Sequence, residues 1–202
     1  MIYKQKLITL MTIFSLMSFG WGLECLDGEV DLGWGDCNDF YSGHSDGCMS
    51  SGCYNIDETT VLELSNSGLT GEIPPKIGDL INLTYLNLWS NQLTGDIPPE
   101  IGNLINLWYL DLQGNQLTGN IPSEIGNLVH LTTLRLNDNN LSGEIPGNIC
   151  DLTIDWSGGH DLIHGIPLQY FDVDNNNLCP PYPDCGEGPV TSENQQNTSN
   201  CP

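Results

Sequence analysis

Leucine and isoleucine recur along the middle of this chain in a pattern that repeats every 24 residues. Four successive copies run from residue 61 to residue 152 and agree at six aliphatic positions. In one copy these positions are Leu86, Leu88, Leu93, Ile97, Ile101 and Leu104. Such a pattern predicts a stack of similar coils, because one coil buries too little apolar surface to stay folded without its neighbours.

The positions within one copy predict its local structure. The first two leucines alternate with outward residues, which indicates a short strand with its leucines inward. Where the chain must then turn, an asparagine amide can satisfy backbone groups left unpaired by the bend. These residues are Asn91, Asn115, Asn139 and Asn176, with Ser67 as a weaker substitute. Gly95 permits backbone dihedrals that a turn requires. The proline of the next Ile-Pro step lacks an N–H donor and ends the ladder of backbone hydrogen bonds. The PxxIGxL segment that follows predicts a 3-10 or one-turn helix.

A fifth, degenerate copy follows the four regular ones. Phe171, Val173, Asn176 and Leu178 occupy its repeat positions, and the turn asparagines 139 and 176 lie 37 residues apart. An insertion within residues 153–167 therefore separates this copy from the fourth. The predicted organisation is a signal peptide (1–22), an N-terminal cap (23–60), four repeats (61–152), the insertion with the last repeat and a C-terminal cap (153–185), and a tail containing Cys201 (186–202).

The N-terminus has the features of a secretory signal. Lys4 and Lys6 precede an apolar run from Leu7 to Phe19, and small residues follow, so cleavage after Gly20 or Gly22 is expected. Elsewhere in the sequence, no apolar stretch approaches the ~20 residues of a membrane span. We therefore expect a secreted protein, extracellular or associated with the cell surface, without membrane insertion.

Eight cysteines lie in two groups of four, one before the repeats and one around their end. They are Cys25, Cys37, Cys48 and Cys53, then Cys150, Cys179, Cys185 and Cys201. An even count in an exported chain without a CxxC pair favours disulfides over zinc. Pairing within each group would leave about nine possible arrangements. Bridges at both ends would cap the stack.

Charge and missing motifs restrict the function. The chain has 26 acidic and four basic residues, and loss of Lys4 and Lys6 with the signal leaves a net charge of −24. Such a surface repels nucleic acid and anionic membranes. The sequence has no G-x-S-x-G, H-E-x-x-H or P-loop motif, so we expect neither an enzyme nor a cofactor.

Metal sites are also disfavoured. His160 and His164 lie near Asp155 and Asp161, but SGGHD indicates a solvated loop. The run 172–177 lacks the glycine and closing glutamate of a calcium loop. The acid-rich segment 24–40 is a weak candidate for Ca²⁺. Sequons stand at Asn82, Asn140 and Asn197, and Asn140 adjoins a turn asparagine.

The consensus LxxLxLxxNxLTGxIPxxIGNLxNL resembles the plant-type extracellular leucine-rich repeat of receptor-kinase ectodomains and polygalacturonase-inhibiting proteins. The resemblance is close over 61–152 and loose over 168–185. It implies a leucine-rich repeat solenoid with a parallel β-sheet on its concave face, 3-10 or short helical turns on its convex side, and disulfide-bonded caps. The end 176-NNLCPPYPDC-185 is similar to the family's C-terminal cap, which implies a Cys179–Cys185 bridge. The N-terminal cysteines match the family's cap in position but lack its adjacent cysteine pair.

The resemblance also implies that the concave face binds partners through outward residues beside the strand leucines. The candidate contact residues are Tyr85, Asn87, Trp89, Trp108, Tyr109, Asp111, Gln113, Arg135, Asn137, Asp172 and Asp174. Because strands of adjacent coils lie ~4.8 Å apart, Tyr85, Tyr109 and Trp89 are expected to form one aromatic patch bordered by Trp108. We predict a recognition module for a protein or peptide ligand. The alternative is a carbohydrate-binding or adhesive surface protein that uses the same aromatics.

Overall fold

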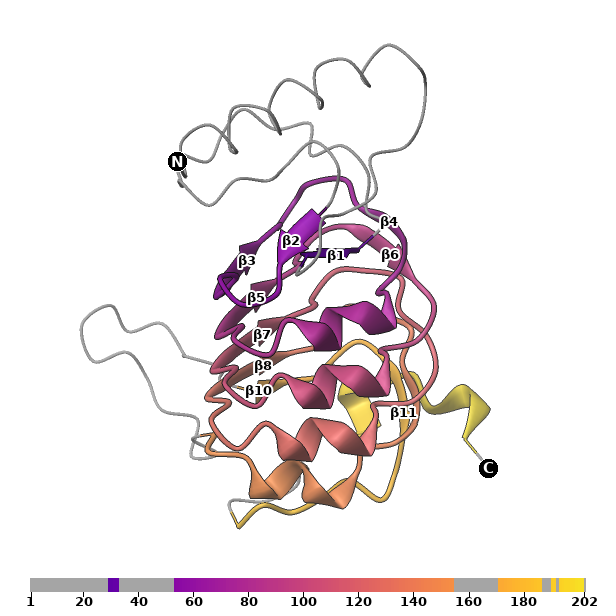
Figure 1. Cartoon of the computed structure of the whole chain (residues 1–202). Helices are drawn as coiled ribbons and strands as arrows, with labels where there is room; N and C mark the ends of the chain where they lie inside the picture. Colours follow the sequence, from indigo (N-terminus) through magenta and orange to yellow (C-terminus); the bar gives the residue numbers. More distant parts are fainter. Residues whose placement is uncertain (1–28, 33–52, 155–170, 187–189, 192, 202) are drawn as a thin grey trace, which may run out of the picture.

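The computed structural model describes residues 29–32, 53–154, 171–186, 190–191 and 193–201. The predicted signal peptide, the insertion with its candidate metal ligands and most of the N-terminal cap lie outside these residues. Within the described part, successive coils are stacked along one direction (Figure 1). The buried aliphatic residues of all the coils form a single continuous core.

A five-stranded parallel sheet follows one side of the stack, with strand order β10-β8-β7-β5-β3. Its strands are β3 (Val61–Glu63), β5 (Tyr85–Asn87), β7 (Tyr109–Asp111), β8 (Thr133–Arg135) and β10 (Phe171–Asp172). Leu62 pairs with Leu86, Leu86 with Leu110, and Leu110 with Leu134, so the register equals the sequence period. Phe171 continues the register against Leu134 despite the insertion between them.

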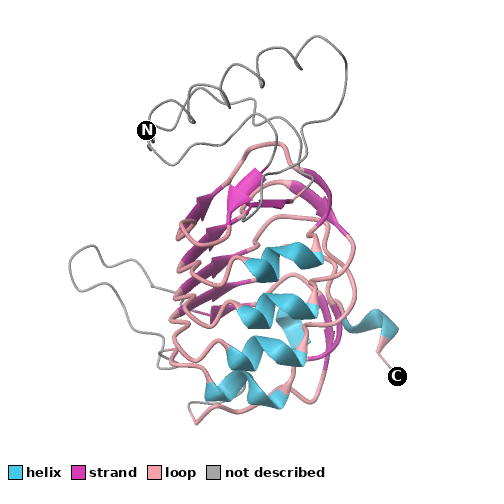
Figure 2. Ribbon diagram, viewed as in Figure 1, coloured by secondary structure: helices cyan, strands magenta, loops and turns pink. Residues whose placement is uncertain are grey.

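Four 3-10 turns form a second column away from the sheet (Figure 2). They are η1 (Pro75–Asp79), η2 (Pro99–Asn103), η3 (Ser123–Asn127) and η4 (Gly147–Asp151). Each follows a proline with extended backbone, such as Pro98 at φ −67° and ψ 138°. The fixed proline φ ends the preceding extended segment and directs the chain into the turn. The 3-10 assignment confirms the prediction from the PxxIGxL segment.

The turn asparagines join adjacent coils as predicted. The Asn115 Nδ2 donates to the carbonyls of Leu112 in its own coil and Leu88 in the preceding coil, both at 3.0 Å. Its Oδ1 accepts a hydrogen bond from the Leu93 N–H at 3.0 Å. Asn91, Asn139 and Asn176 make the equivalent bonds in their coils. These side chains form an asparagine ladder along the whole stack. In the first coil, Ser67 reaches only the Ser65 carbonyl, at 3.2 Å.

A second series of short parallel pairs, which the sequence analysis does not predict, follows the asparagine ladder. The strand β4 (Thr70–Glu72) pairs with β6 (Gln92–Thr94), and β9 (Ser142–Glu144) pairs with β11 (Asn177–Cys179). The strands β4, β6 and β9 overlap the L-T-G and L-S-G steps, whose polar residues and glycine indicate a turn. Their stabilisation comes from backbone bonds between coils, such as Gln92 N–H to Leu69 O at 2.8 Å.

The described part of the N-terminal cap is an antiparallel pair of β1 (Glu29–Asp31) and β2 (Cys53–Asn55). Val30 and Leu32 are buried and belong to the continuous core. This pair therefore covers apolar surface of the first coil, as the cap prediction requires. The cysteines at 25, 37 and 48 lie outside the described residues.

The predicted Cys179–Cys185 bridge is wrong. The structure joins Cys150 to Cys185 and Cys179 to Cys201, with Cα–Cα distances of 5.0 Å and 5.6 Å. The segment after Cys179 packs against the core through Tyr182 and Cys185, and Cys185 is bonded to Cys150 of η4. The tail then returns beside β11, where the Asn197 N–H donates to the Asn176 carbonyl at 2.7 Å and places Cys201 near Cys179.

Peptide mapping of the unreduced protein is expected to show these two pairings. Cleavage before Asp184 separates Cys179 from Cys185, and cleavage after Glu193 separates Cys185 from Cys201. Mass spectrometry should then find the Cys179 fragment linked to the Cys201 fragment, and the Cys185 fragment linked to that of Cys150. A linked Cys179–Cys185 species would contradict the structure. The reduced and alkylated protein is the control.

Candidate functional site

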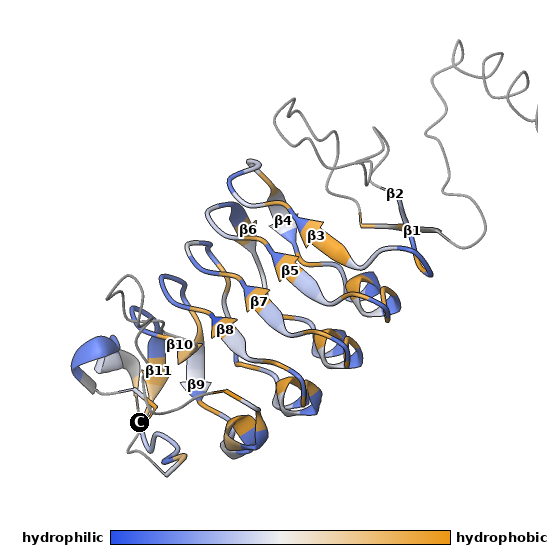
Figure 3. Cartoon of the chain, turned by 90° about the vertical axis from the view of Figure 1, so that its left-hand side faces the viewer, coloured by the Kyte–Doolittle hydropathy of each residue, from blue (hydrophilic) through white to orange (hydrophobic). Residues whose placement is uncertain are grey.

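The concave face is the outward side of the five-stranded sheet, where the strands lie side by side (Figure 3). The sheet register aligns Tyr85 with Tyr109 and Thr133, and Asn87 with Asp111 and Arg135. Residues that are one 24-residue period apart therefore lie side by side across this face.

Three aromatic side chains meet on the N-terminal half of this face. The rings of Tyr85 and Tyr109 are stacked, with centroids 4.5 Å apart and planes 8° from parallel. The Trp108 ring lies 5.6 Å from Tyr85 and 5.7 Å from Tyr109, in tilted and edge arrangements. Trp108 keeps 46% of its surface exposed. We call these three residues the aromatic cluster.

Trp89 is not part of the aromatic cluster, which corrects the predicted patch. Within the described part of the chain, its ring makes no ring contact with Tyr85, Tyr109 or Trp108. Trp89 lies four residues beyond Tyr85 along an extended segment, which corresponds to about 13 Å. Its ring lies near Gly114 of the next coil, and 44% of its surface is exposed. The sequence analysis placed Trp108 only at the border, although Trp108 completes the cluster.

Hydrogen bonds to two carboxylates hold the two phenols of the aromatic cluster. The Tyr85 hydroxyl donates to Glu63 Oε2 at 3.1 Å, and the Tyr109 hydroxyl donates to Asp111 Oδ2 at 3.0 Å. Burial, followed for Tyr109 by the Asp111 carboxylate, raises the pKa of both phenols above their ordinary value. Both therefore remain protonated donors at neutral pH. These hydrogen bonds restrict the rotation of the two phenols, which lowers the entropy cost of binding.

The second column has a structural role that the sequence analysis did not identify. Asn87 and Asp111 are buried, and each accepts a hydrogen bond from the backbone N–H two residues later, at 3.0 Å. Asp172 makes the same bond to Asp174 N–H. Asp111 also forms an ion pair with Arg135 at 3.5 Å. Asn87 and Asp111 therefore support the face from below, whereas Arg135 remains partly open to solvent.

The C-terminal half of the concave face is acidic and amide-rich. Asp138 accepts hydrogen bonds from Gln113 at 3.3 Å, Asn137 at 2.8 Å and Asn175 at 2.7 Å. Burial, and then the neighbouring carboxylates of Asp174 and Asp138, raise the pKa of Asp172, although the Asp174 N–H opposes this shift. This half of the face thus favours a neutral or cationic group over an anionic one.

Among the described residues, no group of three or more histidine, cysteine, aspartate or glutamate side chains has a geometry suited to a metal ion. The histidines at 160 and 164 and most of the acid-rich segment 24–40 lie outside that part. Among the same residues, no helix is both long enough and apolar enough to cross a membrane.

The repeat pattern, the parallel sheet and the asparagine ladder define a leucine-rich repeat solenoid. A family model described as "Leucine rich repeat" matches residues 57–117 and 81–141. No curated protein matches the chain. Residues 57–141 are therefore leucine-rich repeats, and they are similar to those of plant receptor ectodomains.

Solved structures of plant ectodomains are similar to this chain. The BIR2 ectodomain from Arabidopsis thaliana has 27% identity and a TM-score of 0.57, over 84% of this chain and 85% of that one. The ectodomain of the receptor kinase GASSHO1/SCHENGEN3 from Arabidopsis thaliana, in complex with CASPARIAN STRIP INTEGRITY FACTOR 2, has 34% identity and a TM-score of 0.51 over 59% of this chain. The PEPR1–AtPEP1 structure has 39% identity and a TM-score of 0.51 over 61% of this chain.

The chain spans only a small part of the larger receptors that it matches. It covers 13% of the GASSHO1/SCHENGEN3 chain and 16% of the PEPR1 chain. The matched region contains repeats, so the likeness concerns the solenoid. What those receptors bind is a property of the longer proteins.

Proposed function

We propose that this protein is an exported recognition module that binds a protein or peptide ligand through its concave face. The observation that carries the proposal is the aromatic cluster on an open parallel sheet. Trp and Tyr are favoured anchors of protein interfaces because they bury a large area at low entropy cost. Here hydrogen bonds to Glu63 and Asp111 hold the two phenols of the cluster, and Trp108 is half exposed.

The comparisons support the same kind of function. Similar solenoids include a plant receptor ectodomain in complex with CASPARIAN STRIP INTEGRITY FACTOR 2 and the PEPR1–AtPEP1 pair. Export is proposed from residues 1–22, which have the charge and hydropathy of a secretory signal. The acidic C-terminal half of the concave face favours a ligand segment that is neutral or cationic there.

The carbohydrate alternative for the concave face has less support. Sugar binding on aromatic residues requires an open ring face, but Tyr85 and Tyr109 are stacked on each other at 4.5 Å. Trp108 and Trp89 offer the remaining aromatic surface, and they do not contact each other within the described residues. The glycan hypothesis at this face therefore stays a prediction without a specific supporting contact.

Truncation of the aromatic cluster is expected to weaken binding. The chain from residue 23 onward would first be used to capture ligands from extracellular fluid, with identification by mass spectrometry. For a captured ligand, Trp108→Ala and Tyr109→Ala should each raise Kd by at least about fivefold, because each removes a central aromatic anchor.

Val129→Ala is the matched control, since Val129 is exposed to 49% but lies outside the strands of the concave face. Its Kd should equal that of the wild type. The proposal fails if the Trp108→Ala/Tyr109→Ala double variant, shown to be folded by circular dichroism, binds every captured ligand as tightly as the wild type.

A further inference from the structure

The C-terminal tail continues the solenoid by one more rung. The Asn175 N–H donates to the Gln195 carbonyl at 2.8 Å, and the Asn197 N–H donates to the Asn176 carbonyl at 2.7 Å. Gln196 is buried, and its Nε2 donates to the Val173 carbonyl at 3.0 Å. Val173 occupies the repeat position of Leu88 and Leu112, whose carbonyls accept from the asparagine ladder. Gln196 thus extends that ladder by one residue, after which the stack ends.

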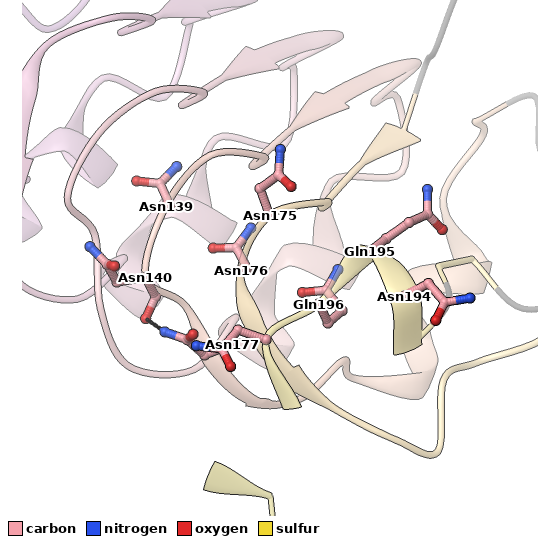
Figure 4. A pocket seen from close by; sticks show the side chains of 9 residues that line it. Asn139, Asn140, Asn175, Asn176, Asn177, Asn194, Gln195 and Gln196 are labelled. Carbon is pink, nitrogen blue, oxygen red and sulfur yellow. Dashed lines mark hydrogen bonds between the residues drawn. The ribbon is translucent and has the colours of Figure 1, made fainter. Parts of the chain in front are cut away.

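A pocket opens where the last two rungs meet, and every side chain that lines it is a carboxamide. Its volume is about 380 Å³, and much of it is open to solvent. The lining residues are Asn139, Asn140, Asn175, Asn176, Asn177, Asn194, Gln195, Gln196 and Asn197. In Figure 4, Asn139, Asn140, Asn175, Asn176 and Asn177 lie on one side of this site, and Asn194, Gln195 and Gln196 lie on the other. We call this site the amide pocket.

The side chains at the floor of the amide pocket are hydrogen-bonded within the protein, with the exception of one oxygen atom. Asn139 and Asn176 use both ends of their amides in the asparagine ladder. Gln196 donates to the Val173 carbonyl and, at 3.1 Å, to Thr191 Oγ1, but its buried Oε1 accepts no hydrogen bond within the described structure. In Figure 4 this oxygen lies on the side of Asn176 and Asn177. A buried acceptor without a partner is costly, so a donor from water or a ligand is expected nearby.

The rim of the amide pocket has unused hydrogen-bonding groups. Asn140 and Asn194 are exposed, and neither side chain is hydrogen-bonded to another described residue. Asn177 donates through Nδ2 to the Asn140 carbonyl at 3.5 Å and leaves its Oδ1 open (Figure 4). Asn197 accepts from the Ser199 hydroxyl at 2.8 Å and leaves its Nδ2 open. The rim therefore presents both donors and acceptors and carries no charge.

We propose that the amide pocket binds a neutral, polyhydroxylated ligand, namely a pyranose residue of a glycan. Each sugar hydroxyl both donates and accepts, and neighbouring hydroxyls can match the oxygen and the NH₂ of one carboxamide. No lining residue is itself charged, and the carboxylates of Asp138 and Asp174, which accept hydrogen bonds from the lining amides of Asn175 and Gln195, disfavour an anionic ligand. A polypeptide would find no apolar or aromatic surface for the anchors that such interfaces use. The site lies at the C-terminal end of the stack and does not depend on the aromatic cluster.

Nuclear magnetic resonance of the ¹⁵N-labelled protein tests this proposal directly. The full chain would be produced in a host that does not N-glycosylate, because Asn140 and Asn197 are sequons on the rim. The probes are the methyl glycosides of glucose, mannose, galactose and N-acetylglucosamine. At least one should shift the side-chain NH₂ signals of the pocket amides, with a Kd in the millimolar range, since hydrogen bonds alone supply the affinity.

The Asn140→Ala/Asn194→Ala variant should weaken that binding by about tenfold or more, because it removes two open carboxamides. Asn127→Ala is the matched control: Asn127 is an exposed asparagine of η3 outside the pocket, and its removal should leave Kd unchanged. Failure of every glycoside to shift the pocket amides overturns the proposal, as does unchanged binding by the double variant. A short asparagine-rich peptide that shifts the same signals more strongly than any glycoside would assign the pocket to a polypeptide instead.

Discussion

Gly102→Ala is expected to lower the free energy of unfolding by about 3 kcal/mol or more, because the coils stack too closely for a side chain at this position. Gly102 lies in η2, and a Cβ there would stand 2.5 Å from the carbonyl oxygen and 2.7 Å from the Cβ of Glu124 in the next coil. The backbone of Gly102 has no positive φ, so alanine itself is conformationally allowed. The whole cost therefore arises from separating η2 and η3.

Gly147→Ala is the matched control for this prediction. Gly147 begins η4, also lacks a positive φ, and has no atom within 4 Å of the Cβ position. Alanine there should leave stability unchanged or raise it by up to about 1 kcal/mol, since it restricts the unfolded chain. Urea unfolding followed by circular dichroism measures both variants. Equal stability of the two would show that the spacing of the 3-10 column does not limit the packing of the coils.

Asn115→Ala is expected to cost about 3–5 kcal/mol, because it leaves several buried backbone groups without partners. The amide of Asn115 bonds the Leu93 N–H and the carbonyls of Leu88 and Leu112, each at 3.0 Å. Each buried group that loses its partner costs about 1–3 kcal/mol, and a cavity in the core adds to this sum. Because two of these groups belong to the preceding coil, the substitution weakens the contact between coils.

Two further variants separate the causes of this loss. Asn115→Asp keeps an acceptor for Leu93 N–H but loses both donors, so it should remain strongly destabilised at neutral pH. Gln116→Ala changes the next residue, which is exposed, and should alter stability by less than about 0.5 kcal/mol. The interpretation of the ladder is contradicted if urea unfolding shows Asn115→Ala to be as stable as Gln116→Ala.

The repeat unit could be predicted because its chemistry is local. The spacing of Leu86 and Leu88 predicts the inward strand, Asn91 the bend, and Pro98 the entry into η2, and the structure confirms all three. The β4–β6 pair could not be predicted, because polar residues and Gly71 hide a strand that only the neighbouring coil stabilises. The role of Gln196 was missed for a similar reason, since its surrounding sequence does not resemble a repeat.

The candidate site was predicted only in outline. The 24-residue period places Tyr85 beside Tyr109, and the sheet register confirms this. Asn87 and Asp111 were expected to be displayed, but both are buried and hydrogen-bonded to the backbone. Alternation along a strand gives the direction of a side chain, whereas its exposure depends on which neighbours fold over it.

By itself, the sequence determined that this protein is a stack of leucine-rich coils with capped ends, because equal residues at equal spacing must adopt equal local conformations. The tertiary structure alone decided that Cys179 bonds Cys201, that Trp108 rather than Trp89 completes the aromatic cluster, and that the carboxamides of Asn140 and Asn194 meet at one pocket. These features depend on distances between segments without a common repeat, and only the packed chain sets those distances.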